Sequence, residues 1–175
     1  MRLAGLTLCL LLAFGGAAAH ADARADYEAA VEAVKKNKRD EAIVLLTKVI
    51  ESKEIEGEQL ATMYYTRADL YSQLQKLDEA VADYTKAIEI MPDHAAAFHD
   101  RATAYALQKK FKEALDDLSR AQFLVPQSPL PYFNRGRVYE MMNRKNDAIA
   151  EYRKARTLAP NMREVQDALK RLGAR

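Results

Sequence analysis

The apolar residues of this chain recur at the spacing of one face of an α-helix. Between residues 77 and 88 they are Leu77, Ala80, Val81, Tyr84, Ala87 and Ile88. A helix with 3.6 residues per turn gathers these positions on one side, whereas a half-buried strand would need strict alternation. The prolines, at 92, 126, 129, 131 and 160, lie between such stretches, where they do not interrupt a helix. The pattern predicts an all-α protein built from short amphipathic helices.

The helical pattern repeats with a fixed period. Alanine recurs at 80, 114 and 148, and proline recurs at 92, 126 and 160, so that every interval is 34 residues. Two further columns keep the same step, namely Tyr71, Tyr105 and Tyr139, and Ala68, Ala102 and Gly136. Four columns in register over three copies indicate a tandem array of one structural unit.

This unit resembles the tetratricopeptide repeat (TPR), whose two helices pack through large residues at positions 4, 11 and 24, small residues at 8, 20 and 27, and a proline at 32. Units that begin at Ala61, Ala95 and Pro129 match this pattern, although Leu118 replaces the aromatic residue at position 24 of the middle one. The resemblance implies a right-handed α-solenoid of helix-turn-helix units, of the type found in exported bacterial proteins.

Both ends of the array depart from the regular unit. The segment 40–43 (Asp-Glu-Ala-Ile) lies 38 residues before its counterpart at 78–81, which predicts a divergent first repeat with four extra residues near Gly57. An apolar stripe from Val165 to Leu172 is typical of a helix that caps an array. The expected layout is a degenerate repeat at 23–60, repeats at 61–94, 95–128 and 129–162, and a capping helix at 163–175.

Residues 1–21 have the three-part layout of a secretory signal peptide. A basic second residue precedes an apolar run over 3–14 and a small-residue segment that ends in an Ala-His-Ala motif. We expect cleavage after Ala21 or Ala23, and a periplasmic or secreted mature protein with no membrane insertion. An uncleaved anchor is disfavoured, because a spanning helix needs roughly 20 apolar residues. The only cysteine, Cys9, would be removed with this segment.

Composition and motifs exclude several functions. The formal net charge is +2, and 27 basic residues are interspersed with 25 acidic ones, which argues against nucleic-acid binding. The sequence has no Gly-rich phosphate loop, nucleophile elbow or HExxH motif, so we expect neither enzyme activity nor a cofactor. His94 and His99 are five residues apart, on different sides of a helix, and we expect no metal site.

The TPR resemblance implies that a protein or peptide binds the concave face, which is lined by the first helix of each unit. Position 5 carries a ring in every unit: Tyr27, Tyr65, His99 and Phe133. Positions 9 and 13 add Asp69, Gln73, Thr103, Leu107, Arg137 and Met141. These ten residues are the expected partner-binding site. The rings either form a ladder for a bound segment or pack against neighbouring helices, and both interpretations stay open.

One mode of binding is not expected. TPR proteins that bind chaperones hold a C-terminal carboxylate with Lys, Asn and Arg at positions 2, 5, 6 and 9. In the first unit these positions hold Arg24, Tyr27, Glu28 and Val31, so this carboxylate clamp is absent.

Two further columns of the repeat carry opposite charges. Position 7 holds Arg67, Arg101 and Arg135, and position 23 holds Asp83, Asp117 and Glu151. We expect these to form an ion pair within each repeat that orients its two helices.

The overall expectation is a periplasmic adaptor for envelope proteins, and the alternative is a self-associating structural protein that forms a homo-oligomer.

Overall fold

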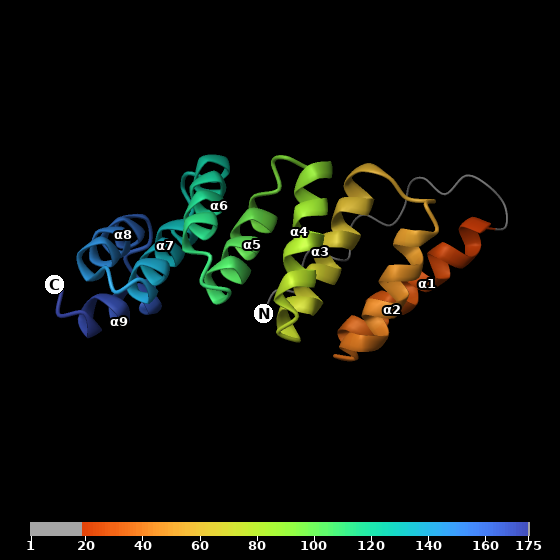
Figure 1. The fold of residues 1–175 in the computed structure, drawn as a ribbon, viewed down its shortest axis with the longest axis horizontal. Coiled ribbons are helices and arrows are strands. Elements are labelled where there is room, and N and C mark those ends of the chain that lie inside the picture. Colours follow the sequence, from red (N-terminus) through yellow and green to blue (C-terminus); the bar gives the residue numbers. More distant parts are fainter. Residues whose placement is uncertain (1–18, 175) are drawn as a thin grey trace. The chain divides into compact units, whose positions relative to one another are not determined.

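The computed structural model describes residues 19–174, with side chains from residue 23 onward. Within this part of the chain there are nine α-helices and no strand (Figure 1), which confirms the all-α prediction. The helices are α1 (Ala19–Lys35), α2 (Arg39–Glu51), α3 (Gly57–Gln73), α4 (Leu77–Ile90), α5 (Ala95–Leu107), α6 (Phe111–Leu124), α7 (Leu130–Met141), α8 (Lys145–Leu158) and α9 (Arg163–Arg171). The predicted signal peptide lies outside the described residues, apart from its last three residues at the start of α1.

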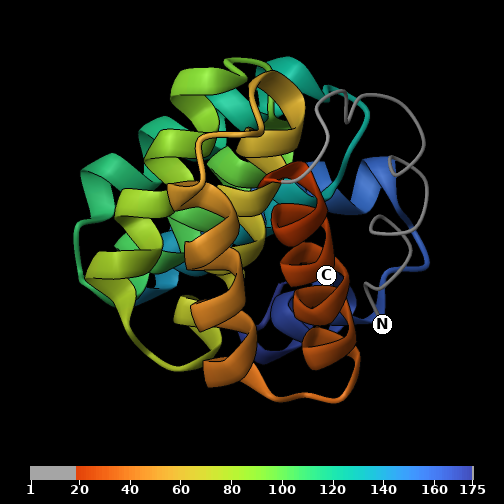
Figure 2. The same ribbon diagram turned by 90° about the vertical axis from the view of Figure 1, so that its right-hand side faces the viewer.

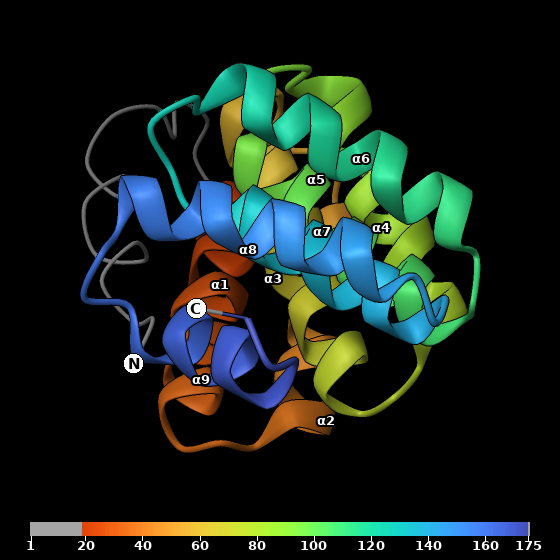
Figure 3. The same ribbon diagram turned by 90° about the vertical axis from the view of Figure 1, so that its left-hand side faces the viewer.

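The chain divides into two compact units, the first ending at Met91 and the second beginning at Pro92. The first contains α1 to α4, and the second contains α5 to α9. In both units consecutive helices pair as antiparallel hairpins. Figure 2 shows the α1–α2 hairpin of the first unit in red and orange, and Figure 3 shows α8 and α9 of the second unit in blue. No described helix is both long enough and apolar enough to cross a membrane.

The turn inside each hairpin has the same backbone geometry. It contains one non-glycine residue with a left-handed φ of 59° or 60°: Asn37, Gln75, Lys109 and Asn143. The next residue closes the helix end through a hydrogen bond to the carbonyl five residues back, as in Lys76 N–H to Tyr71 O at 2.9 Å. This is the Schellman arrangement, which satisfies carbonyls that the helix leaves unpaired. It occurs here without the glycine that usually marks such a turn in a sequence.

The four extra residues predicted near Gly57 lie in α3, the helix that follows the first repeat. Helix α3 has 17 residues, whereas its counterpart α5 has 13, which is a difference of about one helical turn. The helix begins at Gly57, whose φ of +57° suits glycine. The four extra residues therefore extend α3 at its start and do not form a longer loop.

The core of the first unit joins its two hairpins. Leu46 and Val49 of α2 are each 2 % exposed and belong to one buried cluster with Met63 and Leu70 of α3. Small residues of α1 and α2, among them Ala30, complete this cluster and let the helices approach closely. The α1–α2 hairpin thus packs against the hairpin that follows it.

The second unit ends in the short amphipathic helix α9. Val165, Ala168 and Leu169 of α9 are buried in one cluster with Tyr152 of α8, and Leu172 packs against it. The remaining surface of α9 is exposed and polar, as an end cap requires. The helix ends before Gly173, which has a left-handed φ of +71°.

Candidate functional site

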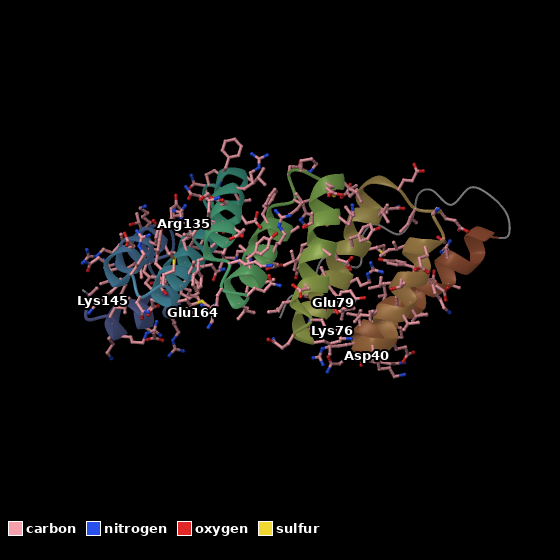
Figure 4. All side chains as sticks on the ribbon, in the orientation of Figure 1. Asp40, Lys76, Glu79, Arg135, Lys145 and Glu164 are labelled. Atoms are coloured by element: carbon pink, nitrogen blue, oxygen red, sulfur yellow. The ribbon has the colours of Figure 1, made fainter. Side chains whose placement is uncertain are left out.

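The predicted ion pair is present in all three regular repeats. The pairs are Arg67–Asp83, Arg101–Asp117 and Arg135–Glu151 (Arg135 is labelled in Figure 4). Their shortest N–O distances are 2.6, 2.8 and 2.6 Å, and in each pair the side chains are 14 % and 9 % exposed. Two guanidinium nitrogens of each arginine donate to the carboxylate. The hydrogen bond to Asp83 raises the pKa of Arg67 above its usual value.

Aromatic rings enclose these arginines. The guanidinium carbon of Arg67 lies 5.6 Å from the ring centre of Tyr64 and 5.9 Å from that of Tyr71. The third nitrogen of Arg67 donates to Thr47 Oγ1 of the preceding repeat at 2.8 Å. The arginine thus ties together both helices of its repeat and the helix before it. This is a structural role, and it leaves no side-chain nitrogen of Arg67 for a partner.

Three rings of the predicted column pack against neighbouring side chains, and two of them, Tyr65 and Phe133, pack on a ring of their own repeat. The ring centre of Tyr65 lies 5.7 Å from that of Tyr84, and the ring centre of Phe133 lies 5.6 Å from that of Tyr152. Tyr27 packs against the buried cluster of the first unit. All three side chains are half-buried. Packing accounts for their position, and the exposed part of each ring remains open to contact.

His99 connects two helices of the second unit. Its Nδ1–H donates to Asp100 Oδ1 at 2.7 Å, and the Asn134 side-chain amide donates to its Nε2. The imidazole is thereby held between α5 and α7. Its backbone carbonyl accepts from Thr103 Oγ1 at 3.2 Å. This histidine orients Asn134 and is itself mostly buried.

In the first unit, the predicted site residues engage one another. Gln73 Nε2 donates to Asp69 Oδ2 at 2.9 Å, and Gln73 Oε1 accepts from Arg39 Nε at 2.9 Å. Both Asp69 and Gln73 are exposed. Their polar groups already have partners, so a ligand would have to compete with these contacts.

The second unit contains a partly open pocket formed by α5, α6 and α7. It is lined by Ala102, Thr103, Ala106, Leu107, Leu118, Asn134, Arg137, Val138 and Met141. The structure thus brings together four of the predicted site residues, namely Thr103, Leu107, Arg137 and Met141. The remaining six do not line this pocket. His99 reaches its edge only through Asn134.

The pocket combines an apolar floor with one exposed cation. Leu118 and Val138 are 1 % and 3 % exposed and form part of the floor. At the rim, Leu107 is 48 % exposed and Met141 is 44 % exposed. The exposed Arg137 side chain forms no ion pair with any described residue. Large exposed apolar side chains beside an unpaired charge are features of a binding surface.

Sequence reasoning missed five residues of this pocket. Ala102, Ala106, Leu118 and Val138 are buried or nearly so, and the repeat pattern gave no reason to place them at a site. Asn134 occupies position 6 of the repeat that begins at Pro129. This position faces the concave side in the TPR family, so the repeat pattern could have identified Asn134 as a site residue.

Among the described residues, no group of three or more histidine, cysteine, aspartate or glutamate side chains is arranged to hold a metal ion.

Comparison with known families and structures agrees with this architecture. Two profiles described as "Tetratricopeptide repeat" match residues 58–122 and 129–162, which together are more than half of the chain. No curated protein has a significant sequence match to the chain.

Three solved structures illustrate the likeness. The first TPR of Spaghetti (RPAP3) bound to the HSP90 peptide SRMEEVD is 27% identical, with a TM-score of 0.63, covering 67% of this chain and 94% of that one. YrrB, described as a TPR protein with an unusual peptide-binding site, is 20% identical, with a TM-score of 0.77, covering 85% and 74%. MamA from Desulfovibrio magneticus is 18% identical, with a TM-score of 0.77, covering 87% and 84%. The last two, at such low identity, bear on the fold alone.

Proposed function

Because the chain belongs to the tetratricopeptide repeat family, we propose that it is an exported, non-catalytic scaffold that binds a segment of a partner protein in the pocket between α5 and α7. The pocket is the observation that supports this proposal, since it contains four predicted site residues and leaves apolar side chains exposed. Support also comes from the RPAP3 repeat domain, which binds a peptide.

The chemistry of the pocket suits an extended segment or one face of a helix. A floor of small and branched residues accommodates an apolar side chain, while Thr103, Asn134 and Arg137 supply polar groups at its edge. A partner segment that covers Leu107 and Met141 would remove apolar surface from water, which is favourable at roughly 25 cal/mol per Å². Binding in this proposal needs no catalytic group.

Export is the second part of the proposal. The N-terminal segment has the layout of a signal peptide, and cleavage after Ala21 would remove the first three residues of α1. The mature protein would then reside in the periplasm, where it would recruit envelope proteins. Mass spectrometry of the purified native protein tests this directly. A chain that begins at Asp22 or Arg24 supports export, and an intact Met1 start in the cytoplasmic fraction contradicts it.

Site-specific photocrosslinking tests the binding proposal. A photoreactive amino acid replaces Leu107 at the rim of the pocket or, as a matched control, the exposed Arg153 on α8, which does not line it. Crosslinking is carried out in the native host, and captured proteins are identified by mass spectrometry. We expect a partner captured from position 107 and not from position 153. Equal capture at both positions would contradict the pocket as the site, and crosslinks only between copies of this chain would favour the self-associating alternative.

A further inference from the structure

Resting on the proposed function, we infer that the pocket of the second unit selects a segment in which an apolar side chain is followed or preceded closely by an acidic one. The surface therefore distinguishes acidic partners from basic ones. The inference comes from the charge of the pocket and from how the acidic groups around it are engaged.

The apolar requirement follows from the rim and floor. Leu107 and Met141 are the last residues of α5 and α7, and both line the pocket, so the ends of these helices meet there. Each exposes nearly half of its surface. The flexible thioether side chain of Met141 adapts to apolar groups of different shape. Ala106 also lines the pocket and leaves space there, because its side chain extends no further than Cβ.

The acidic requirement follows from Arg137. Glu140, the one acidic residue of α7, forms no ion pair with it, because the Glu140 carboxylate accepts from Arg171 at 2.6 and 2.9 Å and from the Tyr152 hydroxyl. Asp100 on α5 accepts from His99. Arg137 thus keeps an unpaired positive charge beside apolar surface, and a ligand carboxylate would complete it.

The helix ends nearby do not reverse this preference. Helix C-termini carry a partial negative charge, which falls off within the last turn. Lys109 follows α5, and Lys145 (Figure 4) begins the helix after α7; both are exposed and form no ion pair with a described residue. These lysines offset the partial negative charge of the helix ends. The charge that a bound segment meets at the pocket is therefore positive.

Selection from a random library tests the inference even though the partner is unidentified. Phage-displayed random octapeptides are enriched on the mature protein and sequenced, in parallel with the variant Leu107→Ser/Met141→Ser, which removes the apolar rim. We expect enriched peptides with aspartate or glutamate next to an apolar residue, and we expect them to be lost from the rim variant. Each variant is first checked for its helical circular dichroism and its unfolding midpoint.

Charge reversal supplies the decisive comparison. For an enriched acidic peptide labelled with fluorescein, we expect Arg137→Glu to weaken binding about ten-fold and Arg137→Gln about three- to five-fold, with a smaller difference in high salt. The control Arg153→Glu makes the same charge change on α8, away from the pocket, and is expected to leave the affinity within about two-fold. Selection on Arg137→Glu should favour lysine- or arginine-containing peptides.

The outcomes separate this inference from the proposed function. Rim-dependent peptides without acidic residues, or equal losses in Arg137→Glu and Arg153→Glu, overturn the acidic preference and leave the pocket as a binding site. If no enriched peptide depends on the rim, both the inference and the proposed peptide-binding function fail.

Discussion

Gly136 stands where the two preceding repeats have alanine, and its replacement by alanine tests how tightly the second unit is packed. A Cβ atom at this position would lie 2.5 Å from Tyr152 Cε1 and 2.7 Å from Tyr152 Cδ1. Because these distances are shorter than real Cβ contacts, the Tyr152 ring or the backbone at position 136 would have to shift. The tyrosine ring is fully buried, packs against Phe133 at 5.6 Å between ring centres, and donates its hydroxyl hydrogen to Glu140 Oε1 at 2.5 Å.

Two opposing effects decide the result. Alanine stabilises a helix interior by about 1 kcal/mol relative to glycine. Overpacking a core in which the neighbour is fixed costs about 1–3 kcal/mol. Because the ring of Tyr152 is held on two sides, we expect the clash to dominate and Gly136→Ala to lower the free energy of unfolding by about 1 kcal/mol. In a chain of this size the melting temperature should fall by about 2–4 °C.

The preceding repeat provides the rescue experiment. There the same two positions hold Ala102 and Leu118, and both side chains are buried without a tyrosine ring. In a Tyr152→Leu background, Gly136→Ala should therefore become stabilising by about 1 kcal/mol, since only the helix propensity remains. Urea unfolding followed by circular dichroism measures both steps. If Gly136→Ala stabilises the protein by the full 1 kcal/mol or so even with Tyr152 present, the ring moves freely and the packing argument is refuted.

Three further predictions concern the framework of the repeats. A double-mutant cycle on Arg67→Met and Asp83→Leu should give a coupling of about 2 kcal/mol in urea unfolding, since the pair is mostly buried and doubly hydrogen-bonded; additive effects would contradict this. Burial and the hydrogen bond to Glu140 raise the pKa of Tyr152, so ionisation of this side chain in the unfolded chain lowers stability as the pH rises above about 10. Tyr152→Phe should flatten that alkaline loss, and an unchanged slope would refute the assignment. Leu169→Ala should destabilise the second unit by about 2–4 kcal/mol in the same assay, because it removes the anchor of α9; a loss below 1 kcal/mol or so would contradict that role.

The repeat framework could be predicted because its signals are local and recur. The column at position 7 pairs with the column at position 23, and the separation of 16 residues is identical in Arg67–Asp83, Arg101–Asp117 and Arg135–Glu151. A helix-turn-helix of fixed length brings the same two positions together each time. The columns, together with their resemblance to the tetratricopeptide repeat, therefore predicted both the fold and these ion pairs.

The turns and the ring column were harder to predict. Gln75 and Lys109 adopt left-handed backbone conformations that neither residue type favours, and the neighbouring helices impose them. The ring of Tyr65 could have faced a ligand or its own repeat, and the choice depends on space left by residues of another helix. Position 24 decides this: Tyr84 offers a ring surface on which Tyr65 packs. Such pairings depend on tertiary structure and cannot be read from one column.

The pocket lies beside two side chains of α7, Arg137 and Met141, that do not pair with each other as their counterparts in the first unit do. Positions 9 and 13 hold Asp69 and Gln73 in the first unit, where the two side chains hydrogen-bond to each other. In the second unit the same positions on α7 hold Arg137 and Met141, which cannot pair in this way. Arg137 forms no ion pair with a described residue, and Met141 leaves its apolar surface exposed. Partner specificity in this chain therefore resides in departures from the repeat consensus, and Arg137 is the first residue to change when that specificity is tested.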